Sequence, residues 1–248
     1  MSELSRVFGM HAVRSLLQRA APRVRSVVVD ARRDDARVRE ILTLAQGAGI
    51  KPVRIDAKAL AAKLGDVTHQ GVYAEVDPLP PWHEDELIEA IAAQRDPLVL
   101  VLDGVQDPHN LGACLRTADA CGAVAVVTPK DRSAAVNATV RKVAVGAAET
   151  TPVATVTNLA RTLKLLKDAG LWIVGADMTG EKLAWEADLR GSLALVLGGE
   201  GDGLRELTRK TCDFLVRLPQ AGSVESLNVS VATGMLLYEA QRQRRNTA

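Results

Sequence analysis

Residues 97–123 read PLVLVLDGVQDPHNLGACLRTADACGA, and this stretch decides the fold class. An apolar run at 97–102 leads into a short polar loop, and then into a segment whose apolar residues recur at helical spacing. Strands that are apolar at nearly every position belong to sheets buried on both faces. The stretch therefore predicts one strand–loop–helix unit of an α/β fold with a parallel sheet.

The same alternation continues to the end of the chain. We predict further strands at 123–128, 171–176, 193–197 and 214–218. We predict helices at about 110–121, 137–147, 157–169, 203–211 and 228–243. In sheets of this kind, ligands bind beyond the carboxyl ends of the strands, so the loops that follow the strands are the places to look for a site.

A composition break at DPLPPWHEDE, residues 77–86, divides the chain. Its closely spaced prolines favour a stiff, extended connection, and its acidic residues begin a predicted helix at 84–94. The segments predicted before the break are GMHAVRSLLQRA and DDARVREILTLAQGAG as helices, and RSVVVD, KPVRID and GVYAEV as strands. We therefore predict a small α/β domain at 1–76, a linker at 77–96 and a larger α/β domain at 97–248.

Charge is spread unevenly, although the net charge of the chain is only +1. Residues 1–76 hold 13 Lys and Arg against 8 Asp and Glu, a surplus of five positive charges. A basic segment is compatible with a polyanionic partner such as RNA, but a solvated charged surface explains it equally well. Aromatic residues make up 3% of the chain, which argues against a base-stacking platform.

The remaining composition is that of an ordinary globular protein, with 47% hydrophobic residues and no apolar run long enough to span a bilayer. We expect a cytoplasmic protein, because the N-terminus has no signal-peptide pattern. Cys114, Cys121 and Cys212 lack the spacing of metal ligands, so we expect buried thiols and no metal site.

The first candidate loop is the start of the helix in the opening stretch. Asn110 is a good helix cap, and Gly112 and Arg116 lie four residues apart on one face. We expect Gly112 to leave room for a substrate and Arg116 to reach over that space. A simple cap and a surface arginine would explain the same residues. The opposite stripe is expected to be core and comprises Leu111, Cys114, Leu115 and Ala118.

The second candidate loop lies in LALVLGGEGDGLREL, residues 193–207. Gly198, Gly199 and Gly201 would let a ligand approach bare backbone amides, and Glu200 stands among them. A tight turn without any ligand would also need these glycines.

The third candidate loop lies in VRLPQAGSVESLNVSVATGMLLYEAQ, residues 216–241. Ser226 or Asn228 would cap the last helix, which is apolar on most sides and so is either buried or packed on a partner. Because all three loops follow strands, they meet at one sheet edge. They bring five candidate catalytic residues there: Asn110, Arg116, Glu200, Ser226 and Asn228.

These three stretches resemble, in order, the three motifs of the SpoU (TrmH) family of RNA 2'-O-ribose methyltransferases, in the SPOUT superfamily. VFGMHAVRSLL and THQGVYAEV resemble the opening and close of the family's small substrate-binding domain. The resemblance implies an L30-like N-terminal domain and a C-terminal trefoil-knot domain. It also implies a homodimer and methylation of a guanosine of 23S rRNA. A tRNA substrate, or a non-catalytic RNA-binding assembly factor, remains an alternative.

The resemblance also implies S-adenosyl-L-methionine (SAM) as the methyl donor. By match to the motifs, SAM would contact Gly198, Leu218 and Leu227, with Gly199 and Gly201 beside it. In the family, the arginine that matches Arg116 is the proposed activator of the ribose hydroxyl. Because a guanidinium stays protonated, we expect Arg116 instead to bind phosphate or ribose and to stabilise developing negative charge.

Overall fold

The structure is a computed structural model that describes residues 4–65, 69–199, 201, 203–223 and 226–245. The chain divides into two compact units, which are described separately. Unit 1 comprises Met1–Pro80 and Val145–Thr150, and unit 2 comprises Pro81–Ala144 and Thr151–Ala248. No helix within the described ranges combines the length and apolar character needed to cross a membrane.

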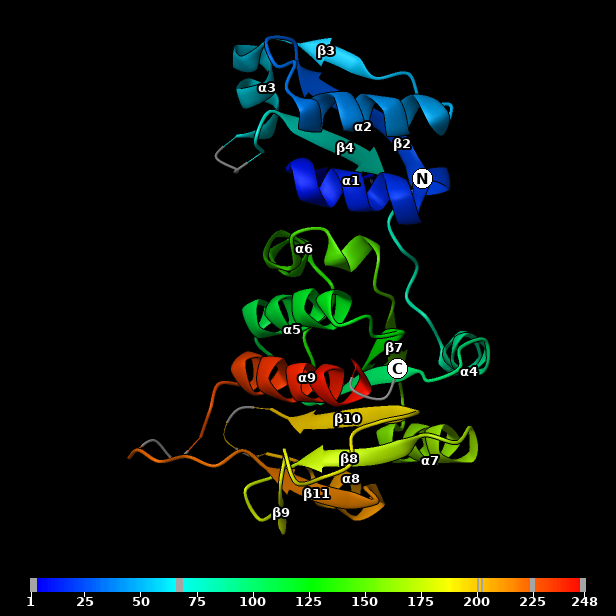
Figure 1. The fold of residues 1–248 in the computed structure, drawn as a ribbon, viewed down its shortest axis with the longest axis vertical. Coiled ribbons are helices and arrows are strands. Elements are labelled where there is room, and N and C mark those ends of the chain that lie inside the picture. The colour runs from blue at the N-terminus through cyan, green and yellow to red at the C-terminus, as the bar shows by residue number, and fades with distance from the viewer. Residues whose placement is uncertain (1–3, 66–68, 200, 202, 224–225, 246–248) are drawn as a thin grey trace. The chain divides into compact units, whose positions relative to one another are not determined.

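Unit 1 is a small sheet with helices packed on it (Figure 1). Its strands are β1 (Ser5–Phe8), β2 (Val24–Asp30), β3 (Val53–Ile55) and β4 (Val72–Val76), and its helices are α1 (Met10–Arg19), α2 (Ala36–Gly47) and α3 (Ala57–Leu64). The strand order is β1-β4-β2-β3, with β4 antiparallel to both neighbours and β3 parallel to β2. The sequence analysis missed β1 and α3, because each is short and has few buried residues.

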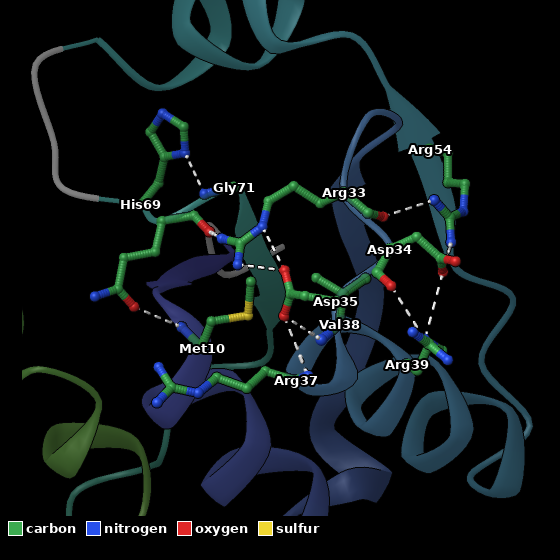
Figure 2. A network of polar contacts seen from close by, with 11 residues as sticks. Met10, Arg33, Asp34, Asp35, Arg37, Val38, Arg39, Arg54, His69 and Gly71 are labelled. Atoms are coloured by element: carbon green, nitrogen blue, oxygen red, sulfur yellow. Dashed lines mark hydrogen bonds and ion pairs between the residues drawn. The ribbon is translucent and has the colours of Figure 1, made fainter.

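A polar network ties together loops at one end of this sheet (Figure 2). The guanidinium of Arg33 binds Asp35, whose other carboxylate oxygen caps the first turn of α2, and also donates to the carbonyl oxygen of Gln70. The Nδ1 of His69 accepts from the backbone N–H of Gly71 at 3.0 Å. Several arginines of this loop region are therefore paired internally, while the surplus of five positive charges in residues 1–76 remains.

Unit 2 contains the regular strand–helix alternation that the sequence predicts (Figure 1). Its strands are β5 (Leu98–Asp103), β6 (Ala125–Pro129), β7 (Val153–Val156), β8 (Trp172–Ala176), β9 (Lys182–Leu183), β10 (Leu193–Gly198) and β11 (Phe214–Arg217). Its helices are α4 (Glu84–Ala92), α5 (Pro108–Ala120), α6 (Ala138–Ala144), α7 (Leu159–Asp168), α8 (Glu206–Thr211) and α9 (Val229–Arg245). The strand order is β7-β6-β5-β10-β8-β11-β9, and every strand pairing described within this sheet is parallel.

Strand β5 lies inside the sheet, and all six of its side chains are buried. Its odd-numbered positions Val99 and Val101 share a core cluster with α4 and α7. Because side chains alternate along a strand, its even-numbered leucines face the opposite side. Burial at every position therefore requires cover on both faces, which is what the continuous apolar run predicted.

Helix α5 packs against α6 and α9. The predicted core stripe of α5, Leu111, Cys114, Leu115 and Ala118, is completely buried. Gly112, however, faces α6: a Cβ built at Gly112 would lie 2.7 Å from the Cβ of Val143 and 2.9 Å from the carbonyl oxygen of Val140. The expectation that Gly112 leaves room for a substrate is therefore wrong, because a neighbouring helix fills that space.

Some predicted elements differ from those observed. Strands β7 and β9 were missed, since β7 has only four residues and β9 only two. Helix α8 begins at Glu206 rather than at 203, because the glycine-rich loop extends further than the pattern suggested. The loops after β10 and β11, where the resemblance implies the knot, include residues 200, 202 and 224–225, which lie outside the described residues.

The buried position of Gly112 leads to a stability prediction. Gly112→Ala is expected to lower the free energy of unfolding by about 1–3 kcal/mol, because the added methyl group overpacks the contact between α5 and α6. Urea unfolding followed by circular dichroism measures the change. The matched control is Gly47→Ala in α2, where a Cβ meets no heavy atom within 4 Å and stability should stay equal or rise. A Gly112→Ala variant as stable as the parent would contradict the close packing of these helices.

Candidate active site

The carboxyl ends of β5 and β10 coincide at the centre of the sheet. In the parallel pairing of these strands Gly198 stands opposite Asp103. Beyond the strands, the backbone N–H of Gly199 donates to the carbonyl oxygen of Asp103 at 2.9 Å. The first and second sequence motifs therefore begin side by side.

A hydrogen bond between two asparagines joins the first motif to the third. The Nδ2 of Asn228 donates to the Oδ1 of Asn110 at 3.0 Å, across 118 residues of sequence. The Oδ1 of Asn228 in turn accepts from the backbone N–H of Ser230 at 2.9 Å. Asn228 thus caps α9, as predicted, and at the same time connects α9 to the start of α5.

Asn110 itself is not the cap of α5, contrary to the expectation. Asp107 caps this helix by accepting from the backbone N–H of His109, and Pro108 takes the first helical position, where its missing N–H costs nothing. Asn110 lies inside the first turn, 8% exposed. Its amide is therefore available for Asn228 rather than used to cap its own helix.

Arg116 lies one helical turn beyond Gly112 and is exposed. Its guanidinium has no hydrogen-bond or ion-pair partner among the residues that the structure describes. Ser226 is also exposed, two residues before Asn228. Glu200 lies outside the described residues, so its predicted place beside Arg116 stays a prediction.

The glycine-rich loop folds back on itself after β10. A Cβ at Gly198 would lie 2.0 Å from the carbonyl carbon of Gly203, and one at Gly199 would lie 2.4 Å from the carbonyl oxygen of Gly104. These two glycines are therefore required by the chain's own backbone, whatever ligand is bound. Gly201 differs, because it has a φ of 89° and open space where a side chain would be.

The sequence analysis missed an ion pair between Asp103 and Arg205. The Asp103 side chain is completely buried, and its carboxylate accepts from the Nε of Arg205 at 2.6 Å and from the backbone N–H of Arg205 at 3.1 Å. An acid that closes the otherwise apolar run LVLVLD was the available signal, because a buried carboxylate needs a cation. Arg205 ends the glycine-rich loop, so the pair fastens this loop to β5.

The residues expected to hold SAM suit an adenosine-containing molecule. Leu218 and Leu227, on either side of the loop after β11, are half-buried and offer partly accessible apolar surface. Gly201 leaves backbone exposed without a side chain in the way. Such ligands are held by apolar walls and a few polar backbone groups, which these residues provide.

Other chemistries find less support at this edge. In the described parts of the chain, no group of three or more His, Cys, Asp or Glu side chains is placed to hold a metal ion. Burial raises the pKa of the Cys114 thiol to about 11 and that of Cys212 to about 12, so neither forms a thiolate near neutral pH. Cys114 is buried as predicted, whereas Cys121 and Cys212 are only partly so.

Comparison with known proteins shows the family to which the chain belongs. Residues 97–238 match the SpoU rRNA methylase family, and residues 6–82 match the family described as RNA 2'-O ribose methyltransferase substrate binding. The chain belongs to the SpoU methylase family. Its fold accordingly combines a substrate-binding domain with a SpoU methyltransferase domain.

Relatives within the SpoU family cover nearly the whole chain. A Pseudomonas aeruginosa protein named 23S rRNA (guanosine-2'-O-)-methyltransferase RlmB is 52% identical over 98% of both chains. The Escherichia coli K12 protein of the same name is 48% identical over 98% of this chain and 100% of its own. The SpoU methyltransferase AviRb from Streptomyces viridochromogenes, solved with the cofactor AdoMet, matches with a TM-score of 0.74 at 26% identity, over 99% of this chain and 92% of its own. SpoU methyltransferases use this cofactor, S-adenosyl-L-methionine.

Removing Arg205 or removing Asp103 is expected to destabilise the protein by different amounts. Arg205→Met is expected to destabilise the protein by about 3 kcal/mol, since it leaves a buried carboxylate without its cation. Asp103→Asn is expected to cost less, about 1–2 kcal/mol, because Arg205 is partly exposed and can turn toward water. Urea unfolding compares the two variants.

The control is Arg190→Met, which removes a similar bidentate pair at the surface, with Asp188, and should change stability little. Equal losses for Arg205→Met and Arg190→Met would show that burial of Asp103 does not set the strength of the pair.

Proposed function

We propose that this protein transfers a methyl group from SAM to the ribose 2'-hydroxyl of a guanosine in 23S rRNA. The observation that carries the proposal is the near-complete overlap with the RlmB relatives, through both the substrate-binding and the methylase parts. A cytoplasmic location follows from this substrate. The division into an RNA-binding domain at 1–76, a linker at 77–96 and a catalytic domain at 97–248 belongs to the same proposal.

The donor would be held at the carboxyl edge of the sheet. When bound, SAM supplies a methyl group that its sulfonium already activates. Gly201 and its neighbours Gly198 and Gly199 would offer backbone to SAM, and Leu218 and Leu227 would enclose its adenine. Asp103 and Arg205 would act indirectly, by fastening the glycine-rich loop.

The remaining task of the site is to make a ribose hydroxyl reactive. This hydroxyl is a poor nucleophile, because its pKa lies well above neutrality. Arg116 stays protonated and therefore cannot remove the proton, but its exposed guanidinium can bind phosphate or ribose and stabilise the charge that develops on the oxygen. A phosphate oxygen or a water molecule would accept the proton.

Four further residues are proposed to position these groups. The Asn110–Asn228 hydrogen bond holds the start of α5 beside the start of α9, so the two amides lie at one place. Ser226 lies just before Asn228 and would contact the ribose or the loop backbone. Glu200 would orient Arg116 or order the glycine-rich loop. Holding the hydroxyl in line with the methyl group is itself a large part of such catalysis.

The proposed function is tested by deleting the gene and mapping the 2'-O-methyl groups of 23S rRNA, and by measuring methylation in vitro. Cells that lack this protein should lose one 2'-O-methylated guanosine from 23S rRNA, and the intact gene should restore it. Arg116→Ala should fail to restore it and should lower the methylation rate in vitro by roughly 10²–10³-fold, the effect of losing one oxyanion donor. SAM affinity should stay unchanged, because Arg116 acts on the acceptor.

The control is Arg95→Ala, which removes an exposed arginine before the amino end of β5 and should restore the modification fully. A methyl group lost from tRNA instead would favour a tRNA substrate. RNA binding without any methyl transfer would favour an assembly factor. Full activity of Arg116→Ala would remove Arg116 from the chemistry.

We also propose that the protein is a homodimer formed through α9. This helix buries one side, including Leu236 and Leu237, but leaves an apolar row exposed at four- and three-residue steps. The row is Val231, Met235 and Tyr238, with exposed fractions of 51%, 45% and 72%. A second copy of the chain would cover this row and explain why the helix is apolar on more than one side.

The dimer proposal predicts that one substitution in this row changes the oligomeric state of the protein. Met235→Asp should shift the protein toward monomer, because it places a charge in the apolar contact. Analytical ultracentrifugation at several protein concentrations measures the shift. Leu207→Asp on α8 is the control, since Leu207 is exposed outside the row and its replacement should leave the dimer intact. A Met235→Asp protein that stays dimeric would place the interface elsewhere.

A further inference from the structure

The loop between β6 and α6 holds an arginine in an unusual backbone conformation. Arg132 has a φ of 58°, in the left-handed region that residues with a Cβ rarely adopt. This conformation costs free energy, so a residue keeps it only where the surrounding structure enforces it. Residues of this kind are concentrated at functional sites. The backbone conformation alone does not assign a role to Arg132, so the role has to be inferred from the residues around it.

The loop lies against the candidate active site. The backbone N–H of Ala134 donates to the carbonyl oxygen of Val105 at 2.9 Å, which joins this loop to the one after β5. A Cβ at Gly104 would lie 3.8 Å from the carbonyl oxygen of Arg132. Gly104 in turn touches the glycine-rich loop through Gly199. Arg132 therefore flanks the same sheet edge as the proposed SAM loop.

The next residue adds a second unfavourable feature. The Oγ of Ser133 is buried and has no hydrogen-bond partner among the residues that the structure describes. A buried hydroxyl without a partner and a left-handed arginine thus stand next to each other in one loop. Neither feature improves the stability of the unit, which favours a functional reason for this loop shape.

The side chain of Arg132 is exposed and, like that of Arg116, has no partner among the described residues. Two other arginines near this edge are paired with an acid, Arg205 with Asp103 and Arg209 with Asp177. A guanidinium at an active-site edge that forms no ion pair within the described residues can bind an anion. Its planar fork matches the oxygens of a phosphate group.

We propose that Arg132 binds a backbone phosphate of the RNA substrate beside the nucleotide that is methylated. The left-handed conformation directs the chain so that this side chain is presented at the site edge, while Arg116 serves the ribose itself. The proposal rests on the proposed function, because it needs an RNA substrate at this edge. It adds a binding residue from a loop that lies outside the three motif loops.

Arg132→Gly separates binding from stability. Glycine adopts a φ of 58° without strain, so the melting temperature should stay equal or rise, and SAM affinity should not change. Affinity for 23S rRNA from cells lacking the protein should fall roughly tenfold, as expected for one charge-assisted contact. The slope of log affinity against log salt should become shallower by about 0.7–0.9, since one phosphate contact is lost.

Two further variants make the result specific. Arg132→Lys keeps the charge and should retain most of the affinity and the full salt slope. Arg95→Gly, at the opposite end of β5, removes another exposed cation and should leave the rRNA affinity and the salt slope unchanged. Unchanged rRNA affinity and salt slope in Arg132→Gly, or equal losses in Arg95→Gly, would overturn the proposal. Failure of the unaltered protein to methylate 23S rRNA would instead overturn the proposed function, since binding and methyl transfer are measured separately.

Discussion

The buried carboxylate of Asp103 is the constraint around which the site is arranged. A charge at the end of a fully apolar strand is unfavourable unless a cation and N–H donors surround it. Arg205 supplies both, through its guanidinium and its backbone N–H. Since Arg205 stands seven residues beyond the end of β10, the intervening chain must turn back over β5 to deliver it. The shape of the glycine-rich loop thus follows from one electrostatic requirement.

The glycines of that loop are needed because the chain turns back over β5. Gly198 and Gly199 face backbone atoms of Gly203 and Gly104 at distances that no Cβ could tolerate. A glycine-rich loop after a strand suggests ligand contact at every glycine, but here two of them serve the chain's own close approach. Gly201 alone, of the three predicted contacts, has open space around it. Packing alone therefore explains why residues 198 and 199 are glycine, whether or not their backbone also contacts a ligand.

Periodicity in the sequence was sufficient for the main features of unit 2, because buried strands and amphipathic helices leave patterns that do not depend on distant residues. The stripe from Leu111 to Ala118 and the continuous apolar run of β5 illustrate this. Pairings across long sequence separations leave no such pattern. The bond between Asn110 and Asn228 and the packing of Gly112 on α6 depend on where other segments fold. The sequence therefore offered Asn110 as a helix cap or a site residue, and Gly112 as space for a substrate.

Charge pairing separates two kinds of arginine that look identical in the sequence. Arg33 in unit 1 binds Asp35 and the carbonyl oxygen of Gln70, and Arg205 in unit 2 binds Asp103, so the positive charge of both is used within the fold. Arg116 and Arg132 stand near an edge where strands end, and neither forms an ion pair within the described parts of the chain. A polyanion gains most from cations that no carboxylate already neutralises. The location of guanidinium groups without an ion pair is therefore a better guide to the place of an RNA contact than the total charge of a domain, which does not say where on the surface the charge lies.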